Sequence, residues 1–168
     1  MRALILAADG FEDSELLVPM FRLQEEGIEV VVAAPDRGTI EGKHGYEVEA
    51  TKTLREVKAK DYDVLVIPGG KAPEAVRLEA NAVAVTKAMV EAGKPAAVIC
   101  HGAQVLISAD VLRGRKATCW KGVRDDLKLA GAAYVDAEVV VDGNLVTSRC
   151  PADLPAFCRE LTKRIGKR

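Results

Sequence analysis

The sequence contains little of what marks several common classes of protein. Phe, Trp and Tyr make up 4% of the 168 residues, and no apolar run approaches the ~20 residues that span a bilayer. The 24 basic residues nearly balance the 25 acidic ones, and charges of one sign are scattered along the chain. We therefore expect no membrane insertion and no specific nucleic-acid binding surface.

Residues that commonly hold metals and cofactors are also scarce. The chain has only two histidines, and its four cysteines include no C-x-x-C pair. These counts argue against a zinc site. The dinucleotide fingerprint G-x-G-x-x-G is absent after the first apolar run, and we expect neither metal nor cofactor. The first residues lack a signal-peptide cleavage site, so we expect a cytoplasmic protein with reduced thiols.

What is present predicts an α/β fold. Continuous apolar runs predict buried strands at residues 2–8, 28–34, 63–70 and 95–100. Helices are predicted at 13–27, 72–93 (one helix or two), 102–112, 121–131 and 151–166, with hairpins at 38–50 and 138–148. The alternation predicts a mostly parallel sheet with helices on both faces, a three-layer α/β/α sandwich formed by one domain over residues 1–168.

Side chains capable of chemistry follow three of the predicted strands. Glu12 follows the first strand, Glu74 follows the strand at 63–67, and Cys100 ends the strand at 95–99. In an open parallel sheet, ligands bind beyond the carboxyl ends of the strands. We therefore expect one rim of the sheet to gather these three residues.

Cys100 is the leading candidate for a nucleophile. His101 and Gly102 follow it at the start of a predicted helix, a layout that is similar to the nucleophile elbow of serine hydrolases. The helix N-terminus is expected to lower the pKa of the thiol and favour thiolate. The match to G-x-S-x-G is poor because Val98 replaces the first glycine. The alternative is that Cys100 is a small buried hydrophobic residue with no chemical role.

The neighbouring candidates each have a plainer alternative. His101 is either a general base or a residue that caps a turn. Glu12 and Glu74 are either acids that serve the thiol or favourable first-turn helix charges. Gly69 and Gly70 either present N–H groups to an oxyanion or form an ordinary turn. Trp120 is expected to line a pocket or to pack, and His44 to lie on the hairpin surface.

Five separated segments resemble the PfpI intracellular cysteine peptidase family of the ThiJ/PfpI superfamily. They are DGFEDSEL, RGTIEGKHGY, PGGKAPEAVR, ICHGAQVLISADVLRGRKAT and RCPADLPAFCREL, in that order. The superfamily has the class I glutamine amidotransferase-like, flavodoxin-like fold. The resemblance runs over almost the whole chain and implies the same fold here.

The resemblance also implies a role for each candidate residue. Cys100 would be the nucleophile and His101 its partner, and Glu74 would orient His101 from a neighbouring subunit. Such a site requires a homo-oligomer, a dimer at least or a hexamer built of dimers. Glu12 would hydrogen-bond the thiol. The oxyanion hole would consist of the N–H groups of Gly70 and His101, and Trp120 would stand at the pocket mouth.

The family is divided in activity, and three functions stay open. The first is a cofactor-independent cysteine enzyme, an intracellular peptidase or a deglycase or glyoxalase-like enzyme in stress response, in which Cys100 attacks the carbonyl of a small molecule or peptide. The second is an oxidative-stress sensor whose Cys100 is oxidised to sulfenic or sulfinic acid. The third is a non-catalytic scaffold with a structural Cys100.

Overall fold

A seven-stranded sheet forms the centre of the molecule in a computed structural model that describes residues 1–166; the last two residues of the predicted domain lie outside this range. The strand order is β10-β11-β7-β6-β1-β2-β5, and only β10 runs antiparallel to its neighbour. The strands are β1 (Arg2–Leu6), β2 (Glu29–Ala34), β5 (Lys52–Thr53), β6 (Val64–Ile67), β7 (Ala96–Ile99), β10 (Val140–Asp142) and β11 (Leu145–Ser148). The prediction of a mostly parallel sheet is confirmed.

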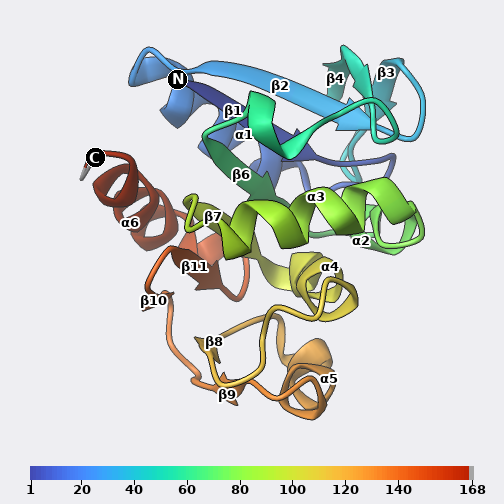
Figure 1. Cartoon of the computed structure of the whole chain (residues 1–168). Helices are drawn as coiled ribbons and strands as arrows, with labels where there is room; N and C mark the ends of the chain where they lie inside the picture. The colour runs from blue at the N-terminus through green and yellow to red at the C-terminus, as the bar shows by residue number, and fades with distance from the viewer. Residues whose placement is uncertain (167–168) are drawn as a thin grey trace.

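Helices cover the sheet on both faces (Figure 1). On one face α1 (Asp13–Glu25) packs beside α6 (Leu154–Ile165). On the other lie α2 (Ala72–Val76), α3 (Ala80–Glu91) and α4 (Ala103–Ser108). The strands β6 and β7 are buried along their whole length, as expected of apolar strands enclosed by two helical layers. The predicted three-layer architecture is therefore confirmed.

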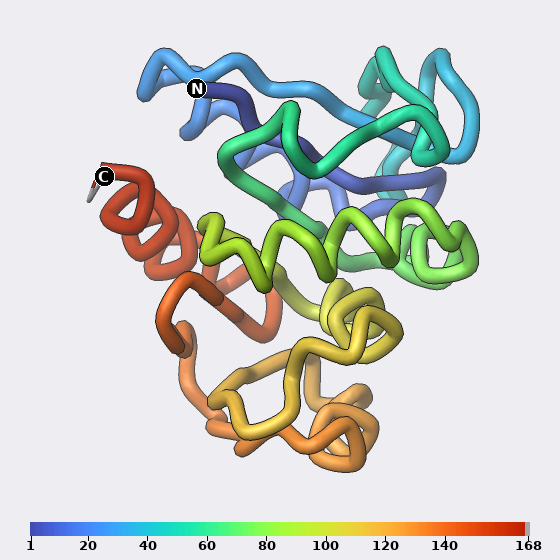
Figure 2. Tube along the Cα trace, in the orientation of Figure 1, coloured from blue at the N-terminus to red at the C-terminus, as the bar shows by residue number. Residues whose placement is uncertain are grey.

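The two halves of the chain build opposite sides of the sheet, as the colour gradient in Figure 2 shows. The predicted hairpin at 38–50 is confirmed as β3 (Gly38–Glu41) and β4 (Glu47–Ala50), which pair antiparallel. At the other end, β8 (Lys116–Ala117) and β9 (Ala133–Tyr134) pair in parallel beside α5 (Arg124–Leu129). Sequence analysis did not predict β5, β8 or β9, because two residues are too few to show a periodicity.

The segment 72–93, predicted as one helix or two, forms two, α2 and α3, because Glu79 adopts an extended conformation between them. The helix predicted at 102–112 begins instead with a 3₁₀ turn over Cys100–Gly102, and α4 ends at Ser108. Among residues 1–166, none of the helices combines the length and the apolar character that a membrane span requires.

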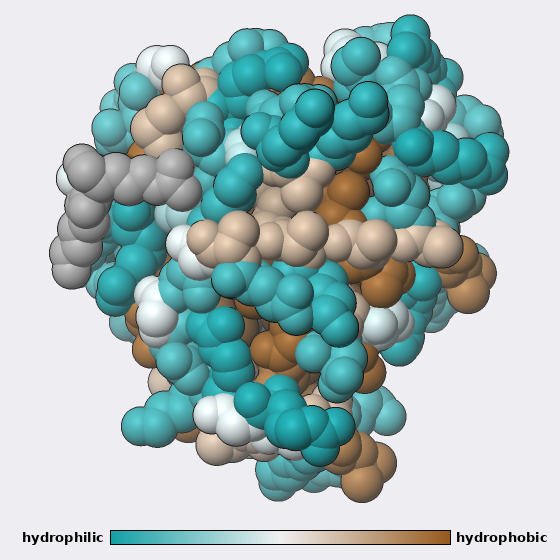
Figure 3. Space-filling view, in the orientation of Figure 1, coloured by the Kyte–Doolittle hydropathy of each residue, from teal (hydrophilic) through white to brown (hydrophobic). Residues whose placement is uncertain are grey.

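The topology fixes where a site can form. Strand β6 lies between β1 and β7, so the carboxyl ends of these three strands are adjacent. Most of the face in Figure 3 is hydrophilic, with hydrophobic side chains visible between the polar ones and at the rim. The candidate residues Glu12, Glu74 and Cys100 follow these strands, so the topology places them at the same end of the sheet.

Candidate active site

A cavity of about 740 Å³ opens at the carboxyl ends of β1, β6 and β7. It is lined by Gly10, Glu12, Glu15, Lys43, His44, Gly70, Lys71, Glu74, Cys100, His101, Trp120 and Pro151. All six residues that the sequence predicted for the site, Cys100, His101, Glu12, Glu74, Gly70 and Trp120, contribute to this lining. The structure thus brings together residues that are up to 108 positions apart, the separation of Glu12 and Trp120 (120 − 12).

The backbone at Cys100 is strained. Its φ of +60° lies in the left-handed region, which non-glycine residues rarely occupy. The turn continues through Gly102, where a Cβ atom would lie 2.6 Å from the carbonyl oxygen of Ile67. No side chain fits at that position, so the strand can pass abruptly into the 3₁₀ turn and raise the sulfur above the end of β7.

The Cys100 sulfur is surrounded by polar groups although the residue is only 8% exposed. Its Sγ atom lies 3.3 Å from Nδ1 of His101. The backbone N–H groups of His101 and Gly70 also donate hydrogen bonds to it. These two N–H groups come from different strand ends, β7 and β6, and converge on the same point. This arrangement can stabilise negative charge on the sulfur or on an oxygen attached next to it.

The pKa of Cys100 departs from the expectation of an already ionised thiol. Burial raises this pKa above its ordinary value, and the charge of the Glu15 carboxylate raises it further. The N–H groups of His101 and Gly70 act in the opposite direction but are the weaker influence. The pKa of Cys100 is therefore raised and not lowered as expected, because burial is the largest influence on it.

The acid that contacts the thiol is Glu15, and the prediction of Glu12 is wrong. Glu15 interacts with the Cys100 side chain, and its Oε2 accepts a hydrogen bond from the N–H of Gly69 at 2.8 Å. The residue is fully buried, and burial raises the pKa of its carboxyl to about 7. Glu12 precedes α1 in an extended conformation, whereas Glu15 lies in the first helical turn and reaches the loop after β6 through Gly69.

Glu12 instead contacts the β3–β4 hairpin. Its Oε1 lies 3.3 Å from Nε2 of His44, and its Oε2 lies 3.4 Å from Nζ of Lys43. His44, which we expected to be a surface residue, is exposed and yet lines the cavity through this contact. The Glu12 carboxylate therefore contacts two basic groups at the cavity rim.

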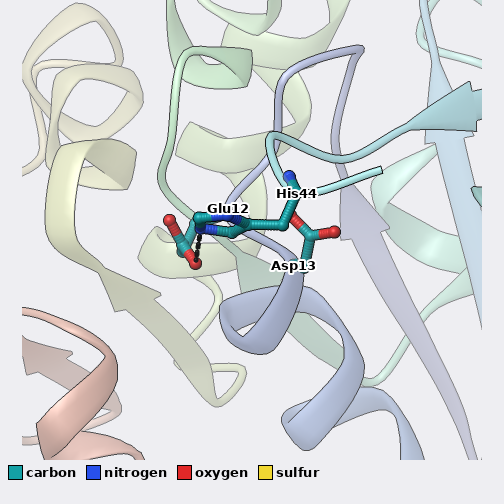
Figure 4. A group of neighbouring side chains, drawn as sticks. All are labelled: Glu12, Asp13 and His44. Carbon is teal, nitrogen blue, oxygen red and sulfur yellow. Dashed lines mark hydrogen bonds and ion pairs between the residues drawn. The ribbon is translucent and has the colours of Figure 1, made fainter. Parts of the chain in front are cut away.

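Asp13 secures the same hairpin from the other side (Figure 4). Its two carboxylate oxygens accept hydrogen bonds from the backbone N–H groups of His44 and Tyr46, each with an N···O distance of 2.9 Å. Figure 4 shows Glu12 at the ring end of His44 and Asp13 at its backbone end. Potential ligand atoms of these three residues lie within 4.8 Å of one another, but each carboxylate already serves the hairpin. Glu12 and Asp13 therefore hold the β3–β4 hairpin through their carboxylate oxygens.

His101 lies between the sulfur and Trp120. Its ring stacks on the Trp120 ring with centroids 6.3 Å apart and planes inclined by 27°. Burial lowers the pKa of His101, the charge of Glu74 raises it, and Lys43 lowers it. Glu74 thus acts on His101 of its own chain through its charge. The contact predicted between Glu74 and His101 of a neighbouring subunit stays a prediction.

Sequence analysis gave no role to several residues of this site, among them Glu15 and Lys43 of the cavity lining and Asp13 beside it. Glu15, Asp13 and Lys43 lie in segments that were quoted for other reasons, DGFEDSEL and RGTIEGKHGY. The acidic segment around Glu12 was a usable signal, because Glu15 lies in it three residues further on, in the first turn of the predicted helix. The sequence could not reveal the hairpin contacts of Asp13 and Lys43, which depend on tertiary structure.

The chain is similar to known proteins over almost its whole length. The model of the DJ-1/PfpI family matches residues 1–164. A deglycase of Thermococcus kodakarensis is 59% identical over 163 residues, covering 97% of this chain and 98% of its own. Protein/nucleic acid deglycase 2 of Escherichia coli is 46% identical over 165 residues, with 96% of both chains covered.

Among solved structures, one similar chain is a two-domain protein from Anabaena variabilis that contains DJ-1/ThiJ/PfpI-like and ferritin-like domains. It superposes with a TM-score of 0.95 at 41% identity, over 98% of this chain and 48% of that one. With a family model that spans nearly the whole chain and relatives this similar, the protein belongs to the DJ-1/PfpI family.

Proposed function

We propose that this protein is a cofactor-independent deglycase that uses Cys100 as its nucleophile. The observation that carries the proposal is the position of the Cys100 Sγ, 3.3 Å from Nδ1 of His101 and in contact with Glu15 and two N–H donors. The similarity to proteins named deglycases supports this substrate class. The substrate would be an amine that carries a glyoxal-derived adduct with a free carbonyl group.

Cys100 and Glu15 would share a single proton in the reactive state. Below about pH 7 both groups are protonated; when one proton leaves, the remaining proton lies on either the sulfur or the carboxyl. The form with a thiolate and a protonated Glu15 is stabilised by the carboxyl O–H, which donates to the sulfur. Glu15 thereby removes its own repulsion from the thiolate, and an otherwise poorly ionised thiol becomes a nucleophile.

The thiolate then takes the place of the amine on the carbon that carries it: a C–S bond forms, the C–N bond breaks, and His101 protonates the departing amine. The hydrogen of that carbon moves as a proton to the neighbouring carbonyl carbon through an enediolate, whose negative oxygen the N–H groups of Gly70 and His101 would stabilise as an oxyanion hole. This shift oxidises one carbon and reduces the other, and it leaves a thioester of a 2-hydroxy acid on Cys100. Water hydrolyses the thioester and frees the thiol, so the adduct and one water molecule give the free amine and a 2-hydroxy acid with no external oxidant or reductant. Trp120 would hold the His101 ring and close the apolar side of the cavity.

Glu74 would complete the site across an interface in a homo-oligomer, a dimer at least. Leu78 lies four residues beyond Glu74, and it is 83% exposed. A neighbouring subunit that covered Leu78 would bury apolar surface next to Glu74, which supports an interface at this place. Glu74 of that subunit would then fix the orientation of His101.

The test measures the release of free amine from methylglyoxal-treated N-acetyl-lysine and N-acetyl-arginine, with free methylglyoxal and a fluorogenic peptide as parallel substrates. The wild type should restore the amines, and Cys100→Ser should lose the activity without losing the fold. The variant Cys158→Ser removes another buried thiol, which lies outside the cavity, and this variant should retain the activity. Peptide cleavage alone would identify a peptidase, and unchanged turnover by Cys100→Ser would exclude Cys100 as the nucleophile.

A further inference from the structure

The cavity rim carries a pair of opposite charges that no step of the proposed reaction uses. Lys43, from the turn between β3 and β4, lies with its Nζ 3.4 Å from Oε2 of Glu12. The Lys43 backbone N–H donates to the carbonyl oxygen of Phe11 at 2.8 Å, which fixes the residue against the loop that precedes α1. Both side chains line the cavity that contains Cys100.

We propose that Lys43 and Glu12 act as opposed positioning charges that set the pH at which the Cys100–Glu15 pair becomes reactive. This inference rests on the proposed function of Cys100 as a nucleophile, and it assigns a role to the β3–β4 hairpin. Neither residue touches the reacting atoms. Each acts through its electric field on the buried pair behind it.

The geometry places both charges where they can act on Glu15. Glu12 directly precedes α1 and Glu15 lies in its first turn, where the Glu15 N–H donates to the Glu12 carbonyl oxygen at 3.1 Å, so the two like charges lie on neighbouring residues of the same turn and repel. The Glu12 side chain is only 13% exposed, and Glu15 is fully buried, so solvent screens the pair poorly. Lys43 contacts Glu12 from the hairpin side and opposes its negative charge.

The direction of each influence agrees with this geometry. The charge of Glu12 raises the pKa of Glu15, and the charge of Lys43 lowers it. Lys43 also lowers the pKa of His101, on which Glu74 acts from α2 in the opposite direction. Further ionisable neighbours are His44, which contacts Glu12, Asp13, whose oxygens bind hairpin N–H groups, and Lys71 of the same cavity lining.

The rate at which Cys100 reacts should rise with pH as the pair loses its first proton, and this rise is the acidic limb of the pH–rate profile. Removal of either charge should shift the acidic limb along the pH axis in a defined direction. The reactive state forms when the Cys100–Glu15 pair loses its first proton, and a nearby positive charge favours that loss. Lys43→Met should shift the limb to higher pH. Glu12→Gln should shift it to lower pH, and the double variant should return it close to the wild-type position, because the two influences have opposite sign.

The experiment measures the rate of Cys100 alkylation by iodoacetamide from pH 5 to 9, followed by peptide mapping that resolves Cys100 from the other cysteines. The same variants are assayed for kcat/KM on the glycated amines. We expect shifts of about 0.5–1 pH unit for the single variants at low ionic strength, reduced by salt. Lys43→Arg should restore the wild-type limb, because it keeps the charge.

Lys71→Met serves as the matched control, since Lys71 is another exposed lysine of the cavity rim but is not among the main influences on the pKa of Glu15 or of His101. Its alkylation limb should stay at the wild-type pH. Shifts of the same sign for Lys43→Met and Glu12→Gln, or an equal shift for Lys71→Met, would overturn the inference. If the two variants shift the alkylation profile in opposite directions but no variant turns over the glycated amines, the inference on Lys43 and Glu12 is supported and only the deglycase activity is rejected.

Discussion

Oε2 of Glu15 and the backbone N of Gly69 are 2.8 Å apart, so a buried carboxyl of the first helix is bound to the loop that follows β6. The other oxygen, Oε1, has no hydrogen-bond partner among the residues described and is fully buried. A lone buried carboxylate oxygen is costly, and a proton relieves that cost. The pKa of Glu15 near 7 follows from this arrangement.

Protein stability should depend on pH through Glu15. Its pKa rises from 4.5 to about 7 on folding, so between these values the folded state binds more protons than the unfolded state. The free energy of unfolding should therefore fall as pH rises from 4.5 to 7, by up to about 3 kcal/mol. Urea unfolding of the wild type and Glu15→Gln across this range measures the effect. The difference between them should widen with pH; a constant difference would contradict the assignment.

The left-handed backbone of Cys100 should be visible in stability measurements. Glycine occupies φ near +60° without the penalty of about 1–2 kcal/mol that a Cβ atom incurs. We expect Cys100→Gly to exceed Cys100→Ala in free energy of unfolding by about 0.5–1 kcal/mol, although both are inactive. At the exposed position Ala88 inside α3, replacement by glycine should instead cost about 1 kcal/mol. A less stable Cys100→Gly would mean that the turn is not strained.

Gly69 should be essential for the relative placement of the catalytic groups. A Cβ atom there would lie 2.5 Å from Oε2 of Glu15 and 2.7 Å from Cβ of Cys100, so Gly69→Ala must displace one of them. We expect a loss of kcat/KM on the order of 10²-fold. The control is Gly27→Ala, at φ +73° with no atom near its Cβ, which should lose about 1 kcal/mol of stability and no activity. Full activity in Gly69→Ala would refute the close packing.

Asp13 should control the order of the hairpin turn. Burial opposes its ionisation, but the N–H groups of His44 and Tyr46 lower its pKa, so the carboxylate is charged and binds both. Asp13→Ala should speed hydrogen exchange at these two amides and reduce stability by about 1–3 kcal/mol. Asp9→Ala removes an acceptor at the hairpin base, where Asp9 Oδ1 binds the Glu41 N–H at 2.8 Å. That variant should affect Glu41 and leave the turn protected.

The sequence was sufficient to predict the sheet and its helical layers, since buried parallel strands such as β6 and β7 are continuous apolar runs. It also placed Cys100 at a strand end, from which the shared cavity followed. It could not distinguish Glu12 from Glu15 as the partner of the thiol. Both fall in the same acidic segment, and the choice depends on which residue begins the first helical turn.

The pKa of Cys100 was beyond sequence reasoning for a different reason. A helix start after cysteine predicts a lowered pKa, but the magnitude of desolvation depends on how many side chains of other segments enclose the sulfur. Glu15 supplies a further influence from a segment 85 residues away (100 − 15). Local patterns carry no information on either quantity.

The loop before α1, the β3–β4 hairpin and the loop after β6 are joined by backbone hydrogen bonds. The Gly10 N–H donates to the Glu41 carbonyl of the hairpin at 2.8 Å, and the Gly10 carbonyl accepts the Lys71 N–H at 2.8 Å. Phe11 and Gly70 also form an isolated antiparallel bridge. This part of the cavity lining is therefore held by the main chain of three segments, so side chains can change there without loss of the hydrogen bonds that shape it.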